Sequence, residues 1–330
     1  MNKRIVITGG AGFIGHHLVN HLLIHTDWDI IVFDKLTYAS SGYDRLRDIN
    51  CFDDKRVHMF TLDIEEPLPI GVLKEIEPVD FVVHMAAETH VDRSIEDAMP
   101  FVRANMLGTA SLLESFKGYP LKAFAYFSTD EVFGPAPAGV YYKEWDRYNS
   151  TNPYSASKAG GEELCLAYAN TYKMPMIITH TMNVFGERQH PEKYIPMVIK
   201  KVLKGEKVMI HSDPTKTISG SRCWIHARNV ADGILFLLKD TEKYAVREKY
   251  NIAGEELSNF EMAQVIADVL NKNLNFELVD FHSSRPGHDL RYALDRTKMS
   301  ELGWDLKVDL KKSLAKTVHW YLENKKWLNL

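Results

Sequence analysis

The chain has 330 residues, 45% of them hydrophobic and 25% charged, which is the composition of an ordinary globular protein with a sizeable core. Its formal net charge of −4 gives no sign of a nucleic-acid or acidic-membrane partner, and no apolar stretch approaches the roughly 20 residues that span a bilayer. Three scattered cysteines and an N-terminus without a signal-peptide pattern predict reduced thiols in a cytoplasmic protein.

The first half of the sequence alternates short apolar runs with segments of helical length. Strands are expected at residues 4–8, 30–33, 57–62, 81–84, 123–128 and 176–181. Helices are expected between them, at residues 12–25, 70–77, 98–116 and 154–172. Apolar strands separated by helices predict a parallel sheet covered on both faces, and right-handed crossovers then give a doubly wound α/β fold of the Rossmann type.

Beyond residue 181 the pattern is less regular. Helices are expected at residues 230–238, 260–270 and 310–324, and a loop is expected at residues 213–221. We therefore expect a Rossmann domain over residues 1–180 and a smaller, mixed C-terminal lobe over residues 181–330. The boundary near residue 180 is approximate, because such lobes often exchange strands with the main sheet and the two segments can interleave.

A glycine-rich turn joins the first expected strand to the first expected helix. Gly9 permits the tight turn, Gly12 lets a diphosphate approach the backbone, and Gly15 allows close helix–strand packing. The start of the helix offers unpaired N–H groups and a favourable dipole to an anion. Asp34 ends the second strand about 20 residues further on, where it can accept hydrogen bonds from an adenosine ribose and repel a 2′-phosphate. The spacing predicts a dinucleotide site that prefers NAD to NADP, although the neighbouring Lys35 weakens the repulsion.

A phenol and an ammonium stand four residues apart, at Tyr154 and Lys158, in a segment of helical pattern. On a helix the two side chains share one face. A nearby cation favours the phenolate and lowers the pKa of the tyrosine, which makes it a usable base toward a sugar hydroxyl. The lysine can also hold the nicotinamide ribose.

Two adjacent acids, Asp130 and Glu131, follow Thr129 just past the expected strand at 123–128. Ligands bind at this carboxyl edge in open α/β sheets. Oxidation of a hexose at C4 acidifies its C5 proton, so one carboxylate can remove that proton while a protonated carboxyl delivers a proton to the departing C6 oxygen. The two carboxyls must lie in unequal environments for this division of roles.

The glycine turn, together with Tyr154 and Lys158, resembles the extended short-chain dehydrogenase/reductases. Within that superfamily, Thr129, Asp130 and Glu131 resemble the Thr-Asp-Glu hallmark of the nucleotide-sugar 4,6-dehydratases, which include the dTDP-glucose enzymes. The resemblance implies a lyase that converts a nucleotide-diphosphate hexose to its 4-keto-6-deoxy product without consuming its NAD. It further implies that Thr129 binds a substrate hydroxyl, Asp130 is the acid for water loss and Glu131 is the base at C5.

The resemblance extends over most of the chain. It makes residues 1–180 the NAD-binding domain and residues 181–330 the nucleotide-sugar-binding lobe, and it implies a homodimer that pairs through helices 98–116 and 154–172. The residues that it assigns to NAD are Gly9, Gly12, Phe13, Ile14, Gly15, Asp34, Lys35, Thr37, Asp63, Ile64, Ala86, Ala87, Thr89, Asn105, Tyr154 and Lys158. Those that it assigns to the substrate are Thr89, Thr129, Asn183, Glu192, Lys193, Arg222, Asn259, Arg285, His288 and Tyr292.

Several alternatives stay open. Departures from the family pattern at residues 188–190 and 213–221 and at Cys223 leave open the nucleobase (dT, U or G), the substituent at C2 of the hexose, and inversion at C5. A 4-epimerase or a simple reductase would need only Thr129, Tyr154 and Lys158 and would leave the two acids idle. A non-catalytic dinucleotide sensor usually lacks the tyrosine or the lysine. The histidines show no metal-ligand spacing, so no metal is expected.

Overall fold

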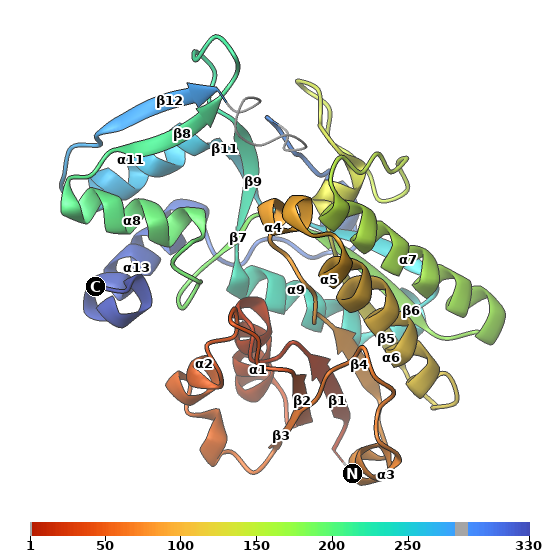
Figure 1. Cartoon of the computed structure of the whole chain (residues 1–330). Coiled ribbons are helices and arrows are strands. Elements are labelled where there is room, and N and C mark those ends of the chain that lie inside the picture. Colours follow the sequence, from red (N-terminus) through yellow and green to blue (C-terminus); the bar gives the residue numbers. More distant parts are fainter. Residues whose placement is uncertain (1, 281–289) are drawn as a thin grey trace.

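The computed structural model describes residues 2–280 and 290–330 of the chain (Figure 1). Seven strands form a central sheet in the order β3-β2-β1-β4-β5-β6-β10, and every neighbouring pair is parallel. The strands are β1 (Arg4–Thr8), β2 (Asp29–Asp34), β3 (Val57–Thr61), β4 (Phe81–His84), β5 (Ala123–Thr129), β6 (Met176–Thr181) and β10 (Glu248–Ile252). All seven carboxyl ends therefore lie at one edge of the sheet.

Helices cover both faces of this sheet. They are α1 (Phe13–His25) and α9 (Ala227–Lys239) on one face, and α3 (Ile70–Ile76), α6 (Gly108–Phe116) and α7 (Pro153–Tyr172) on the other. Because successive side chains of a strand point to opposite faces, Ile5 and Ile7 of β1 join the first apolar core, whereas Val6 joins the second. This double burial explains why the strands read as continuous apolar runs.

The remaining chain builds a lobe beside the carboxyl edge, at the upper left of Figure 1. It contains a three-stranded sheet in the order β11-β9-β7, a two-stranded parallel sheet of β12 and β8, and an apolar core that includes Trp224, Met262 and Leu314. Its elements are β7 (Val184–Phe185), α8 (Tyr194–Lys204), β8 (Val208–Ser212), β9 (Ser221–His226), β11 (Glu255–Ser258), α11 (Asn259–Val269), β12 (Phe276–Asp280) and α13 (Leu310–Glu323).

Short helical elements connect these layers. They are α2 (Asp44–Asp48), α4 (Val91–Glu96), α5 (Met99–Val102), α10 (Thr241–Tyr244), α12 (Thr297–Glu301), a π turn (Arg103–Leu107) and 3₁₀ turns at Cys51–Asp53, Asp130–Phe133 and Lys325–Leu328. Among the helices of the two described ranges, none has the length and apolar character needed to cross a membrane.

The doubly wound α/β fold expected from the sequence is confirmed, and the helix expected over residues 98–116 is present with a π turn within it. The segment consists of α5, the π turn and α6. Within this segment the carbonyl of Asn105 accepts the hydroxyl of Thr109 at 2.7 Å, and the Asn105 side-chain amide donates to the carbonyl of Glu88 at 3.0 Å. Such single π turns are frequent at functional sites.

Two elements from beyond residue 180 belong to the layers of the central sheet. β10 pairs with β6 and completes the sheet, and α9 packs against α1 through side chains such as Leu18 and Ile234. The chain thus leaves the sheet after β6, builds part of the lobe, and returns.

Two helical glycines provide a matched test of the packing between α7 and the sheet. A Cβ on Gly161 of α7 would lie 2.2 Å from the Tyr126 hydroxyl and 2.7 Å from the Asn105 carbonyl oxygen, whereas a Cβ on Gly71 of α3 would meet no atom within 4 Å. We expect Gly161→Ala to lower the free energy of unfolding by about 1–3 kcal/mol, because backbone must move to admit the methyl group. We expect Gly71→Ala to raise it by up to about 1 kcal/mol. Urea unfolding followed by circular dichroism measures both changes, and equal effects would contradict this packing.

Candidate active site

A cavity of about 700 Å³ lies between the carboxyl edge of the sheet and the lobe. Its walls come from the segments that follow β1 to β6 and from α8, β9 and α11 of the lobe. Of the site residues expected from the sequence, all that fall in the described ranges line this cavity except Asn105. Arg285 and His288 lie outside the described residues.

The glycine turn forms the wall at the end of β1. Gly9 has a φ of +71°, a conformation that favours glycine, and a Cβ there would lie 2.8 Å from the backbone nitrogen of Ala86. A Cβ on Gly15 would lie 2.2 Å from the carbonyl oxygen of Gly9. Gly12 is the N-cap of α1, and no side chain caps this helix. The first N–H groups of α1 and its dipole therefore fit the diphosphate of a dinucleotide.

Asp34 lies at the end of β2, where it supports the glycine turn. Its two carboxylate oxygens accept the N–H of Ala11 at 3.1 Å and the N–H of Leu36 at 2.8 Å. Burial raises the pKa of Asp34, and these two hydrogen bonds act against the rise. The carboxylate is thus held in one orientation at the cavity wall, within the region that a ribose would occupy next to the glycine turn.

Lys35 does not remain as an isolated cation beside Asp34. Its ammonium pairs with Asp63 at 3.1 Å and with Glu65 at 2.7 Å. Two carboxylates therefore balance the positive charge of Lys35. This charge no longer weakens the repulsion that Asp34 would exert on the 2′-phosphate of NADP. This part of the cavity fits the ribose diol of NAD.

The loop after β4 forms the next wall, and two side chains beneath it set its course. The hydroxyl of Thr8 accepts the N–H of Ala86 at 3.1 Å. The Asn105 side chain accepts the N–H of Glu88 at 2.9 Å and donates to the Glu88 carbonyl at 3.0 Å and to the Ser157 hydroxyl at 2.9 Å. Asn105 therefore shapes the loop that lines the cavity and does not line the cavity itself.

Thr129 is the last residue of β5 and the N-cap of the 3₁₀ turn that carries the two acids. Its hydroxyl donates to Oδ1 of Asp130 at 3.0 Å and accepts the N–H of Glu131 at 3.4 Å. Asp130 is 4% exposed, and burial, followed by the charge of Glu131, raises its pKa to about 7. Its Oδ2 atom is buried and has no hydrogen-bond partner among the described residues.

Glu131 lies in a different environment, because its carboxylate accepts a hydrogen bond from the side-chain amide of Asn152 at 3.1 Å. Asn152 also caps the start of α7 through a reciprocal pair of hydrogen bonds with Ser155. The same asparagine thus links Glu131 to the helix that carries Tyr154. Burial therefore keeps Asp130 partly protonated near neutral pH.

Tyr154 and Lys158 share one face of the first turns of α7 and are 8% and 3% exposed. The expectation that the cation lowers the pKa of Tyr154 is wrong for this arrangement: burial, followed by the charge of Glu131, raises it well above its ordinary value. The Lys158 ammonium lies 4.2 Å from the ring centre of Tyr126, and burial lowers its pKa to about 8. Burial disfavours charge on both groups, so the phenol keeps its proton until more positive charge comes near.

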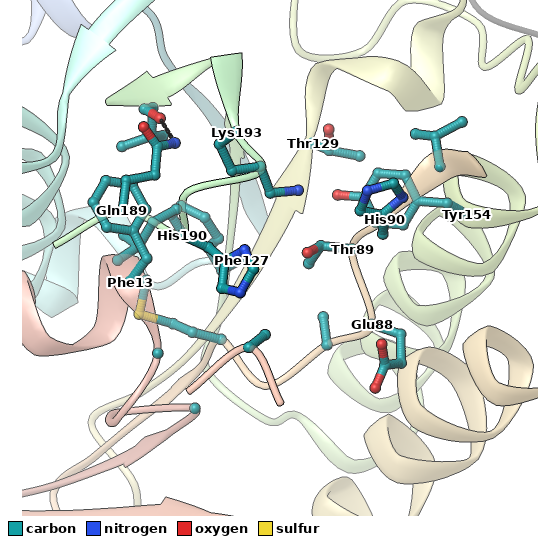
Figure 2. A pocket seen from close by; sticks show the side chains of 18 of the residues that line it. Phe13, Glu88, Thr89, His90, Phe127, Thr129, Tyr154, Gln189, His190 and Lys193 are labelled. Carbon is teal, nitrogen blue, oxygen red and sulfur yellow. Dashed lines mark hydrogen bonds between the residues drawn. The ribbon is translucent and has the colours of Figure 1, made fainter. Parts of the chain in front are cut away.

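On the lobe side, Lys193 is the N-cap of α8, and its side chain extends across the cavity toward Tyr154 (Figure 2). Glu192 beside it lies 3.5 Å from His190 and 3.9 Å from His90. Within residues 2–280 and 290–330, no three His, Cys, Asp or Glu side chains are grouped so that they could hold a metal ion.

The far wall of the cavity comes from β9 and α11. Arg222 donates to the carbonyl of Leu290 at 2.8 Å, and its guanidinium lies 4.7 Å from the ring centre of Tyr292. Asn259, the first residue of α11, accepts the Tyr194 hydroxyl at its carbonyl at 2.6 Å. Cationic and aromatic groups on this wall fit the phosphates and the base of a nucleotide.

Sequence reasoning missed some cavity residues. Arg45 is fully buried and donates to the carbonyls of Ser40 at 2.7 Å and Arg188 at 2.9 Å, so it ties the turn after β2 to the loop before α8. Arg45 belongs to no spaced motif, so a single sequence carries no signal that separates it from a solvated surface charge.

The raised pKa of Asp130 predicts a pH-dependent cost of folding. Its pKa rises from 3.8 to about 7 on burial, so the folded state resists ionisation and stability is lost as the pH rises through this window. An amide cannot ionise, so we expect Asp130→Asn to exceed the wild type in unfolding free energy by up to about 4 kcal/mol above about pH 7, and to match it near pH 4.

Urea unfolding at several pH values measures this difference, with the exposed Asp53→Asn as the control. A difference for Asp130→Asn that stayed constant with pH would contradict a buried, protonated carboxyl.

Comparison with known proteins identifies the family. The model of the NAD dependent epimerase/dehydratase family matches residues 5–253. The dTDP-glucose 4,6-dehydratase of Escherichia coli is 35% identical over 98% of this chain and 95% of its own length. The low-salt glycan biosynthesis protein Agl12 of Haloferax volcanii is 37% identical over 96% of this chain and 98% of its own length.

Comparison with solved structures gives the same family. DesIV from Streptomyces venezuelae, a dTDP-glucose 4,6-dehydratase with NAD and dTDP bound, is 36% identical, covers 98% of both chains and has a TM-score of 0.86. The UDP-glucuronic acid 4-epimerase from Bacillus cereus, in complex with UDP-glucuronic acid and NAD, is 26% identical with a TM-score of 0.86 and covers 97% of this chain and 99% of its own. The resemblance read from the glycine turn and the Thr-Asp-Glu run is thereby confirmed. This chain belongs to the NAD dependent epimerase/dehydratase family.

Proposed function

We propose that this protein dehydrates a nucleotide-activated hexose to its 4-keto-6-deoxy product, with bound NAD and with dTDP-glucose as the first candidate substrate. The observation that carries the proposal is the carboxyl of Asp130. It is buried at the cavity wall beside Glu131, is partly protonated near neutral pH, and has one oxygen without a hydrogen-bond partner in the described part of the chain. A reaction confined to oxidation and reduction at C4 has no use for such an acid. The relatives named dTDP-glucose 4,6-dehydratase support the same choice.

Binding of the two ligands falls to the two sides of the cavity. The glycine turn and Asp34 hold NAD, and the cations Lys193 and Arg222 face the diphosphate of the substrate. The Lys193 side chain extends across the cavity toward Tyr154, so we place the hexose between these two residues.

Oxidation at C4 uses the groups at the start of α7. Once Tyr154 has released its phenolic proton to solvent, its phenolate takes the proton of the C4 hydroxyl, and Thr129 binds the same oxygen. Lys158, one helical turn away, does not by itself offset the burial of Tyr154, so the positive charge of the oxidised nicotinamide, when bound, would supply the further stabilisation that the phenolate needs. NAD, held by the glycine turn and Asp34, would supply the hydride acceptor for oxidation at C4 and the hydride donor for reduction at C6.

Elimination uses the two acids. Glu131 removes the C5 proton, which the 4-keto group acidifies, and later returns it. Asp130 gives its proton to the C6 oxygen, which leaves as water. The proton that Tyr154 took up is released and Asp130 is reprotonated, so the net change is the loss of one water. The unequal environments of the acids allow this division of roles.

Mass spectrometry after incubation with dTDP-glucose, UDP-glucose, UDP-N-acetylglucosamine and a GDP-hexose tests the proposal. We expect dTDP-glucose to lose the mass of one water, with no net build-up of reduced cofactor. If only a UDP- or GDP-hexose lost water, the nucleobase that we propose for the substrate would be wrong, but the proposed dehydration would stand. A product of unchanged mass would contradict dehydration and favour a 4-epimerase.

Three variants separate the two halves of the reaction. We expect Tyr154→Phe to abolish both dehydration and exchange of the C5 hydrogen with deuterium oxide, because both follow oxidation. Glu131→Gln should block that exchange. Asp130→Asn should slow water loss while leaving some exchange, because the 4-keto group still acidifies C5. We expect the dehydration rate to fall about 10²–10⁴-fold when a general acid or base of this kind is removed. Near-wild-type dehydration by both amide variants would contradict these roles.

We further propose that the protein acts as a homodimer in the cytoplasm. The three cysteines are free and buried, which suits a reducing compartment. Large apolar side chains are exposed along the segment from α5 to α6, among them Met99 at 54% and Leu107 at 53%. A second copy that packs α5–α6 and α7 against the same elements across a two-fold axis would cover them.

Light scattering tests this association. We expect a mass of twice 37.8 kDa at micromolar concentration for the wild type, and dissociation for Leu107→Glu, because a charge is placed in the covered apolar surface. Ile24→Glu is the matched control, since Ile24 is 66% exposed on α1, away from these helices. A wild-type mass of 37.8 kDa alone would contradict the dimer.

A further inference from the structure

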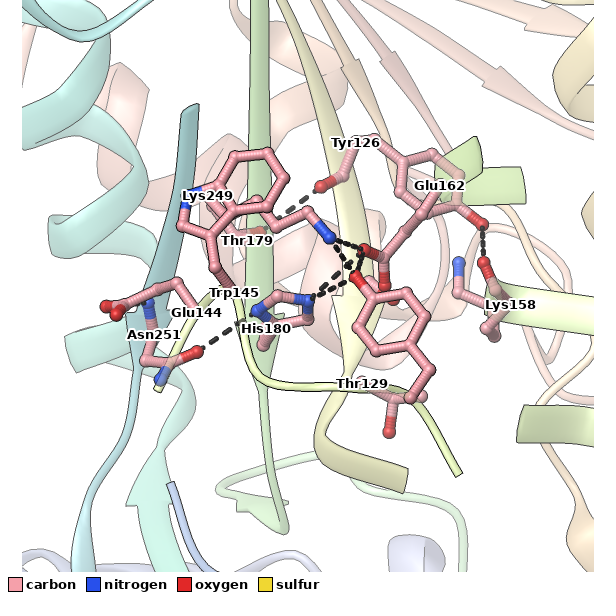
Figure 3. A network of polar contacts seen from close by, with 12 residues as sticks. Tyr126, Thr129, Glu144, Trp145, Lys158, Glu162, Thr179, His180, Lys249 and Asn251 are labelled. Carbon is pink, nitrogen blue, oxygen red and sulfur yellow. Dashed lines mark hydrogen bonds and ion pairs between the residues drawn. The ribbon is translucent and has the colours of Figure 1, made fainter. Parts of the chain in front are cut away.

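A buried carboxylate lies directly behind the candidate active site, at the face of α7 that packs on the sheet (Figure 3). Glu162 follows Lys158 by one helical turn and Tyr154 by two, and its side chain is fully buried. It does not line the cavity. The proposed function gives it no role.

The partners of Glu162 come from four separate segments of the chain. One carboxylate oxygen accepts the hydroxyl of Ser128 on β5. The other accepts the hydroxyl of Tyr148, in the loop before α7, and lies 3.2 Å from Nε2 of His180 on β6 and 3.4 Å from Nζ of Lys249 on β10. These contacts join three neighbouring strands to the helix of Tyr154 and Lys158 (Figure 3).

Glu162 is charged despite its burial. Burial acts to raise its pKa, but His180, Lys249 and the Ser128 hydrogen bond outweigh that effect and lower the pKa to about 2. A buried ion persists only where opposite charges and hydrogen bonds compensate it. The network continues outward through Asn251, whose side chain lies 3.0 Å from Nδ1 of His180, to Glu144, which accepts the Asn251 N–H at 3.2 Å.

Lys158 faces this carboxylate from the cavity side. The titratable groups that act on Lys158, or on which it acts, are His84 of β4, Tyr126 of β5, and Glu162 and Cys165 of α7, with Tyr154 one turn away on the same face. Burial lowers the pKa of His84 to about 3 and raises those of Tyr126, Tyr154 and Cys165 well above their ordinary values, so these four are neutral. Within this set, the negative charge near Lys158 is that of Glu162.

The same carboxylate also holds the strand that carries the acids. Ser128, its hydrogen-bond partner, immediately precedes Thr129, and Thr129 caps the turn of Asp130 and Glu131. A change at Glu162 therefore acts on Lys158 by charge and on the acids through the end of β5.

We propose that Glu162 is a positioning residue: its carboxylate keeps the Lys158 ammonium charged and in place, and it fixes the end of β5 that bears Thr129 and Asp130. The consequence for turnover rests on the proposed function, whereas the consequence for Lys158 does not. Lys249 forms an ion pair with this carboxylate at 3.4 Å. Loss of Glu162 removes a negative charge near Lys158 and loss of Lys249 removes a positive one, so the two changes act on Lys158 in opposite senses.

The test measures the titration of Lys158 in NAD-loaded protein by ¹³Cε-lysine NMR, with Lys158→Met for assignment. In Glu162→Gln we expect Lys158 to lose its proton at lower pH than in the wild type, by about one pH unit or more, because an opposite charge nearby is gone. In Lys249→Met we expect the titration to move to higher pH, because a like charge is gone. Glu144→Gln removes a buried carboxylate at the far end of the network and should leave Lys158 unchanged. Loosened packing cannot produce shifts of opposite sign.

Kinetics supply the second readout. We expect the alkaline limb of the kcat profile to move to lower pH in Glu162→Gln and to higher pH in Lys249→Met, with KM for the nucleotide-hexose changed less than about threefold, and partial recovery in Glu162→Asp. If Glu162→Gln does not fold, the direction of the Lys158 titration shift in Lys249→Met still tests the proposal. A wild-type titration of Lys158 in both variants, or shifts of the same sign, would overturn the proposal. Absence of dehydration by the wild type would overturn the proposed function and leave the NMR result standing.

Discussion

The hydrogen-bonded register of the parallel sheet determines how the candidate site is assembled, because it sets the level at which each strand ends. Thr8 at the end of β1 pairs with His84, and His84 pairs with Tyr126. β5 then continues for three residues to Thr129, which is about 10 Å further along the strand direction, and there it pairs with Thr181. The two acids therefore lie further along the strand direction than the glycine turn, and the cavity occupies the space that this difference in strand ends creates. A slip of one residue would send every side chain of β5 to the other face.

Burial shifts the pKa values of the proton-handling groups in the direction that favours their uncharged forms. Removal from water disfavours the charged form of each group, so the pKa of Asp130 and that of Tyr154 rise while that of Lys158 falls. Glu162 departs from this rule because cations and hydroxyls meet both of its oxygens. A site of this kind keeps its acid partly protonated near neutral pH, and the protonated form is the one that water loss requires.

The sequence predicted what depends on local pattern. The strands at residues 4–8, 81–84 and 176–181 and the shared face of Tyr154 and Lys158 follow from periodicity and spacing. Asn105 lies in a π turn, which interrupts the α-helical hydrogen-bond pattern of this segment, and no residue type in the sequence predicts such a turn. The network of Glu162, His180 and Lys249 depends on β10 lying next to β6, and no local sequence pattern encodes this pairing across the first part of the lobe. The rise in the Tyr154 pKa has the same origin, because burial is a property of the folded chain.

The excursion of the chain between β6 and β10 has a consequence for how the molecule forms. Until residues 248–252 have left the ribosome, β6 is the outer strand of the sheet, and all six of its residues belong to the buried set of the finished protein. An apolar strand with a free row of N–H and C=O groups is a template for wrong pairing. The unpaired edge of β6 is therefore exposed to wrong pairing while the ribosome still synthesises the first part of the lobe. The sheet and the lobe then complete folding together, through contacts between residues far apart in the sequence.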